Sequence, residues 1–134
     1  MIGADDILIV AEPDLANLRN AKNMLNILKA ARPNDRPPLY CLNQVGMPKR
    51  PEIEPRGFTK TIETPPIASI PFDSRMFGTA ANNGQMIAEI AANHRTTKMF
   101  MQIAQRLTGR ETKKPNGSFL SPLIRKLRVG RGAA

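Results

Sequence analysis

The sequence contains one cysteine, one histidine and no tryptophan in 134 residues. The single cysteine, Cys41, leaves neither a disulfide framework nor a metal cluster to be built, and it suits a small buried apolar position. His94 has no Cys or Ser partner in a matching context, so we expect it at the surface. No run approaches the ~20 apolar residues of a membrane span, and no secretion signal is recognisable at the N-terminus. These observations predict a cytoplasmic protein.

Aromatic residues are also scarce. One Tyr and five Phe give little material for base stacking. The formal charge of +9 comes mostly from residues 110–134, where seven Lys or Arg stand against one acidic residue, Glu111. Because this excess is not spread over a folded face, nucleic acid is not an expected partner.

Two runs of strand-forming residues flank a helix near the N-terminus. Residues 6–11 are a continuous aliphatic run, which predicts a central strand covered on both faces. Residues 38–44 predict a second strand of the same kind. Asp14 can cap the helix between them, whose apolar positions are Leu15, Leu18, Ala21, Leu25 and Leu28. This order predicts a βαβ unit with parallel strands.

Shorter elements follow. Residues 47–55 carry three prolines and predict a loop. Residues 56–63 predict a short helix with Phe58 and Ile62 on one side, and residues 66–70 predict a third strand.

The last part of residues 1–109 is expected to be a loop and two helices. Residues 75–84 are rich in small side chains and predict the loop. Residues 85–92 and 96–107 predict the helices, and Gly109 is a natural stop after them. Their expected buried positions are Met86, Ile87, Ile90, Met99, Phe100, Ile103 and Leu107.

The whole pattern predicts an α/β fold, the C-terminal part of a doubly wound, mainly parallel sheet. Such sheets carry about five or six strands, so three strands are a portion of one. The aliphatic run at Ile7–Val10 has no charge or proline and would then be an edge that a neighbouring strand covers. We divide the chain into residues 1–109, this α/β portion, and residues 110–134, a basic tail.

Polar side chains follow the second strand. Asn43 and Gln44 stand at its end, and Pro71, Phe72 and Asp73 follow the third strand. In open parallel sheets, ligands bind outside the carboxyl ends of the strands. An amide donates and accepts at once, which suits the edge of a purine base. An asparagine after a strand also commonly closes its own turn, and the residue types alone leave both interpretations open.

Four segments, residues 6–21, 42–46, 70–73 and 78–84, together resemble the C-terminal part of the MinD/ParA group of P-loop ATPases. Residues 43–53 resemble the CpaE branch of that group, also called TadZ, the pilus-assembly proteins. The resemblance covers about residues 6–109. It implies a P-loop NTPase fold, ATP as the cofactor, and pilus or type II-like secretion machinery as partners.

The resemblance also implies roles for individual positions. Asn43 would recognise the adenine base, and the loop of Pro71, Phe72 and Asp73 would pass over the same base with its backbone. Residues 13–20 would lie near a nucleotide-dependent homodimer interface, although an asparagine stands at position 20, where MinD-like members commonly carry an acid.

No segment resembles the Gly-rich loop, with its Lys and Ser or Thr, that binds phosphates in this group. Mg²⁺-dependent ATP binding would therefore need that missing half. We assign no catalytic or metal-binding residue and expect no ATP hydrolysis by this chain alone. The alternative is a catalytically inert adaptor of the same fold that binds partner proteins or a membrane surface without nucleotide.

The tail contains one amphipathic segment, residues 119–128. Its apolar residues are Phe119, Leu120, Leu123, Ile124 and Leu127, and Arg125, Lys126 and Arg128 are basic. A short basic amphipathic helix attaches weakly to anionic lipid, which suggests contact with the inner-membrane surface. A solubilising end and a docking segment for a partner are the other interpretations.

Overall fold

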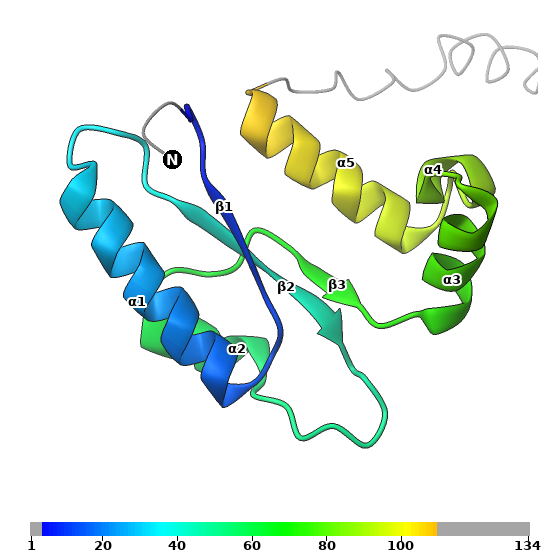
Figure 1. Ribbon diagram of the computed structural model, residues 1–134, viewed down its shortest axis with the longest axis horizontal. Coiled ribbons are helices and arrows are strands. Elements are labelled where there is room, and N and C mark those ends of the chain that lie inside the picture. The colour runs from blue at the N-terminus through cyan, green and yellow to red at the C-terminus, as the bar shows by residue number, and fades with distance from the viewer. Residues whose placement is uncertain (1–3, 110–134) are drawn as a thin grey trace, which may run out of the picture.

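The computed structural model describes residues 4–109, in the order β1-α1-β2-α2-β3-α3-α4-α5 (Figure 1). One parallel sheet contains β1 (Leu8–Ala11), β2 (Leu39–Val45) and β3 (Ser69–Pro71), with β2 in the middle. The predicted βαβ unit is confirmed, because α1 (Leu15–Ala31) connects two parallel strands. The tail, including residues 119–128, lies outside the described residues.

Helix α1 begins and packs as its sequence predicts. The Asp14 carboxylate accepts a hydrogen bond from the Asn17 backbone N–H at 2.7 Å, which satisfies one of the unpaired donors of the first turn. The predicted apolar stripe is buried at Leu18, Ala21, Leu25 and Leu28. Leu15 is 52% exposed, because side chains lean toward the N-terminus of a helix and a residue in the first position has no preceding turn to cover.

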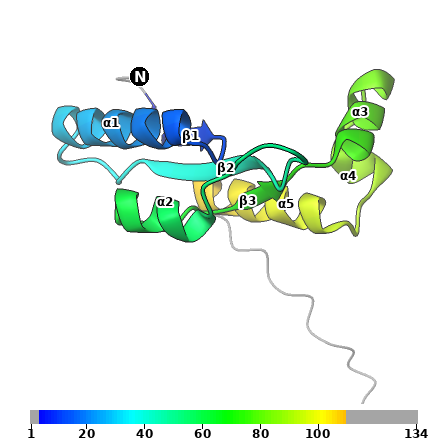
Figure 2. The ribbon, with the colours of Figure 1, turned by 90° about the horizontal axis from the view of Figure 1, so that it is seen from below.

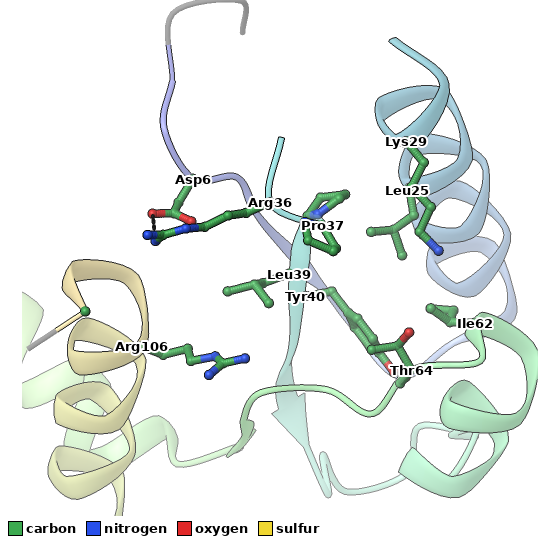
Figure 3. A pocket seen from close by; sticks show the side chains of 12 residues that line it. Asp6, Leu25, Lys29, Arg36, Pro37, Leu39, Tyr40, Ile62, Thr64 and Arg106 are labelled. Atoms are coloured by element: carbon green, nitrogen blue, oxygen red, sulfur yellow. Dashed lines mark hydrogen bonds and ion pairs between the residues drawn. The ribbon is translucent and has the colours of Figure 1, made fainter. Parts of the chain in front are cut away.

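Helices cover both faces of the sheet. Figure 3 shows Tyr40 of β2 directed toward Ile62 of α2 (Pro55–Ile62), and Leu39 directed toward the side of Arg106 in α5 (Arg95–Thr108). Tyr40 stacks on Phe58 with ring centroids 6.5 Å apart. The main core on that face consists of Leu18, Ala21, Leu25, Tyr40, Leu42, Phe58 and Ile62, together with Ala11. Strand β2 is therefore covered on both faces, as predicted, and Cys41 within it is buried.

The prediction of a central, doubly covered first strand is wrong for the described sheet. Strand β1 lies at its edge, and Val10 is 60% exposed. An aliphatic run indicates that a strand is suited to burial, but it does not indicate which strands lie beside it. The alternative expectation, an apolar edge, matches the described arrangement. Its cover by a neighbouring strand stays a prediction.

The segment predicted as a loop over 75–84 is helical. Helix α3 (Ser74–Asn83) begins where the Asp73 carboxylate accepts the Met76 N–H at 2.9 Å, and it ends at Gly84, whose φ is +62°. Asp73 caps the start and Gly84 the end of this helix, and these two caps support it although glycine and asparagine within it are poor helix formers. Both views place α3 at the opposite end of the molecule from α1 and α2 (Figure 1 and Figure 2).

The two last helices are shorter or less buried than predicted. Helix α4 (Ile87–Ile90) is a single turn without a buried residue, and Met86 before it is 67% exposed. Helix α5 is confirmed, with Gly109 at its end in the left-handed conformation. Only Ile103 of its predicted apolar positions is buried, while Phe100 is 41% exposed. A three-stranded sheet offers α5 a narrow face, since the helix packs against β3, and this leaves much of its apolar side uncovered.

Candidate functional site

A pocket of about 230 Å³ lies at the carboxyl ends of β2 and β3. Its lining residues are Asn43, Gln44, Pro71, Phe72, Asp73, Ser74 and Phe77. The four residues singled out from the sequence therefore line one pocket, together with Gln44. Pockets for drug-sized ligands measure roughly 300–1,000 Å³, so this pocket suits a single ring system better than a whole nucleotide.

The wall formed by β2 is irregular at the pocket. Leu42 pairs with Ser69 and Val45 pairs with Pro71, so β2 has one residue more than β3 over this stretch. Gln44 adopts a φ of +55°, a left-handed conformation that costs a non-glycine residue about 1–3 kcal/mol. Bulges of this kind redirect side chains and are frequent beside functional sites. Here the bulge consists of Asn43 and Gln44.

The wall formed by the end of β3 is fixed by backbone contacts. The N–H of Phe72 donates to the carbonyl of Val45 at 2.8 Å, which joins the two walls directly. The Asp73 carboxylate is engaged as the cap of α3. Asp73 therefore serves first to begin that helix, and Pro71 and Phe72 present the rest of this wall.

Sequence reasoning missed a group of charged residues beside the pocket. Arg50, in the loop after β2, donates to the Glu12 carboxylate at 2.6 Å and to the Glu52 carboxylate at 2.9 Å. It also donates to the backbone carbonyl of Gln44. The side chains of Arg50 and Glu52 are each 19% exposed. Glu12 lies 38 residues from Arg50 along the chain, so no local spacing could have revealed the pair.

Glu52 holds the start of the same loop. Its carboxylate accepts the N–H of Gly46 at 2.9 Å and the N–H of Met47 at 3.1 Å. The bond from Gly46, with help from Arg50, lowers the pKa of this carboxyl below its usual value. At the far end of the loop, the Ile53 N–H donates to the carbonyl of Pro13 at 2.8 Å. Loop 46–53 is thereby tied to the turn between β1 and α1.

A larger hollow, of about 680 Å³, lies at the amino ends of the strands (Figure 3). Among its polar groups, Asp6 lies 3.5 Å from Arg36, and the Tyr40 hydroxyl donates to the carbonyl of Thr64 at 2.8 Å. Ligands of open parallel sheets bind at the opposite edge. The smaller pocket at Asn43 is therefore the candidate site, in spite of its size.

Among residues 4–109, no three His, Cys, Asp or Glu side chains are grouped so that they could hold a metal ion. His94 is exposed, and its side chain accepts the Thr96 N–H at 3.3 Å as the cap of α5. Within the same range, no helix has both the length and the apolar character that crossing a membrane requires.

The three parallel strands with helices on both faces match part of the P-loop ATPase fold of the MinD/ParA type. A chain of the MinC:MinD cell division protein complex of Aquifex aeolicus superposes with a TM-score of 0.66 at 18% identity, covering 87% of this chain and 48% of that one. The cell division ATPase MinD of Pyrococcus furiosus gives 0.67 at 23% identity, with 81% and 44% covered. A ParA family ATPase from Chlorobium tepidum gives 0.57 at 23%, with 74% and 40% covered.

At these identities the likeness shows the fold alone. The chain spans less than half the length of each of these solved structures. No family model and no curated protein matches the sequence. The CpaE branch and the roles of the individual site residues therefore stay predictions.

Proposed function

We propose that residues 1–109 are the C-terminal portion of a MinD/ParA-type domain and supply the adenine-recognition side of its ATP site. The observation that carries this proposal is the single pocket that Asn43, Pro71 and Phe72 line together. The Asn43 amide, half-buried at the end of β2, has the donor and acceptor that the edge of adenine requires. The phosphate-binding loop and the Mg²⁺ site belong to another part of the same domain.

The biological role that we propose is that of a CpaE-type localisation protein for pilus or secretion machinery. Residues 43–53, which carry the resemblance to that branch, form the bulge and the loop beside the pocket. The protein would act as a homodimer in the cytoplasm, with residues 119–128 as its contact to the inner-membrane surface.

Isothermal titration calorimetry with ATP tests the proposal. The 134-residue chain is compared with a longer form that includes a phosphate-binding loop. Asn43→Ala is compared with Asn26→Ala, an exposed position on α1. We expect binding by the longer form, weakened about tenfold by Asn43→Ala, which is the order of one lost hydrogen bond. Asn26→Ala should bind as the unaltered protein does.

The opposite result has a definite meaning. A longer form that is folded, carries the phosphate loop and binds no ATP would make this protein an inert adaptor. Unchanged affinity in Asn43→Ala would remove the role assigned to the pocket.

A further inference from the structure

We propose that Arg50 is a positioning residue of this pocket, which holds Gln44, and through it Asn43, in the conformation that meets the base. The inference rests on the proposed function, since it names what keeps Asn43 in place. Arg50 itself would contact no ligand and would act through the backbone of Gln44.

The geometry of the guanidinium supports this role. One terminal nitrogen donates to Glu12 at 2.6 Å, and the other donates to Glu52 at 2.9 Å and to the Gln44 carbonyl. A planar fork held by two carboxylates has little rotational freedom, and charge-assisted hydrogen bonds of this kind are strong. The donor that faces Gln44 is therefore fixed from two sides.

Gln44 is the residue in this wall that needs such support. Its left-handed φ of +55° is unfavourable for a side chain with a Cβ, and a bulge removes backbone groups from the regular ladder. Arg50 supplies a donor to the carbonyl of this residue. If Gln44 relaxed to an extended conformation, the bulge would be lost, the pairing of β2 with β3 would change between Leu42 and Val45, and the Asn43 side chain would be displaced from its place in the pocket.

The same contacts tie the pocket to the rest of the fold. Glu12 follows β1 directly, and loop 46–53 is bonded to Pro13 at its end. Arg50 thus connects the pocket wall, at Gln44 of β2, to the residue that follows β1. Lysine at position 50 would keep the charge, but a single ammonium does not reproduce the fork that reaches three acceptors.

The test uses calorimetry to measure the binding of two ligands to the longer form that includes a phosphate-binding loop. The ligands are ATP and inorganic tripolyphosphate, which has no base. The variants are Arg50→Gln and Arg50→Lys, with Arg56→Gln as a matched control at an exposed position of α2. We expect both Arg50 variants to bind ATP about tenfold more weakly while their affinity for tripolyphosphate stays unchanged. Arg56→Gln should match the unaltered protein for both ligands.

Equal losses for ATP and tripolyphosphate would mean general unfolding and would overturn the positioning role, as would unchanged ATP binding. Full ATP binding by Arg50→Lys would also overturn it, because charge alone would then be enough. Asn43→Ala, measured in parallel, separates the two proposals. If it weakens ATP binding and Arg50→Gln does not, the positioning role falls and the proposed function stands. If the unaltered protein binds no ATP, or Asn43→Ala has no effect, both proposals fall.

Discussion

The backbone N–H of Phe72 donates a hydrogen bond of 2.8 Å to the carbonyl of Val45. This bond joins the residue after β3 to the last residue of β2, and the candidate pocket lies beside it. Both walls of the pocket are therefore extensions of the sheet. A site on such a frame is held more accurately than one on unsupported loops.

The donor in this bond is the backbone N–H of residue 72. The effect of a substitution there on ATP affinity should therefore depend on whether the new residue has a backbone N–H. Phe72→Leu keeps the N–H and an apolar side chain, and we expect its affinity for ATP to stay within about threefold. Phe72→Pro removes the donor and should weaken binding at least about tenfold. Calorimetry on the longer form measures the ATP affinity of both variants, and circular dichroism checks that they are folded. Equal losses in the two variants would instead assign the effect to the aromatic ring.

The depressed pKa of Glu52 predicts a dependence of stability on acid. A carboxyl whose pKa is lower in the folded state stabilises that state above its unfolded pKa, about 4.3 for Glu. The contribution disappears as the pH falls from that value through the folded-state pKa. Urea unfolding between about pH 6 and pH 3 should therefore show a smaller loss of stability in Glu52→Gln than in the unaltered protein.

Asp14 complicates this comparison, because its pKa is lowered too, chiefly by the Asn17 N–H. Asp14→Asn keeps a capping side chain but does not titrate, so the double variant with Glu52→Gln should show the smallest dependence on acid. Identical pH profiles in Glu52→Gln and the unaltered protein would contradict the role assigned to Glu52.

Two glycines should respond to alanine with opposite signs. Gly46, which begins the loop after β2, has a φ of +82°, and alanine there should cost about 1–2 kcal/mol of stability. Gly78 lies within α3, and a Cβ added there meets nothing within 4 Å. Alanine at that position should stabilise by about 0.5–1 kcal/mol. Thermal unfolding of both variants gives the sign of each change in stability. Destabilisation by Gly78→Ala would argue against helix α3.

Alanine substitution at two leucines should show how much burial of the side chain contributes to the free energy of unfolding. The Leu42 side chain is fully buried, and Leu42→Ala should lower the free energy of unfolding by about 2–5 kcal/mol. Leu15 is 52% exposed, so Leu15→Ala should change it by no more than about 0.5 kcal/mol. Urea denaturation compares them. Similar losses at both positions would mean that the start of α1 is covered by a surface that residues 4–109 do not supply.

Local signals were sufficient for the first half of the fold. Asp14 followed by an apolar stripe specified the start and the buried face of α1, and apolar runs marked β1 and β2. Each of these features depends on neighbours within a few residues. The meeting of Asn43 with Phe72 could also be predicted, because the carboxyl ends of parallel strands lie at one edge.

Other features were not predicted correctly from the pattern. Residues 75–84 look like a loop by composition, yet they form a helix between Asp73 and Gly84, two local capping residues that composition alone does not take into account. The burial of Met86 and Phe100 was predicted from helical periodicity, which does not show how much surface the neighbouring elements provide, and the described sheet has three strands.

The sequence by itself determined the parallel βαβ unit, the cap of α1 at Asp14, and the two polar segments at the carboxyl edge of the sheet, because these follow from short-range periodicity and side-chain chemistry. Only the tertiary structure decided which of the two expectations for β1 holds in the described sheet, that Gln44 takes a left-handed conformation, and that Arg50 joins Glu12 to the wall of the pocket. The reason is distance along the chain. A guanidinium can pair with any carboxylate that lies near it. Only the packing of the strands brings the Glu12 carboxylate, 38 residues away along the chain, to 2.6 Å from the Arg50 guanidinium.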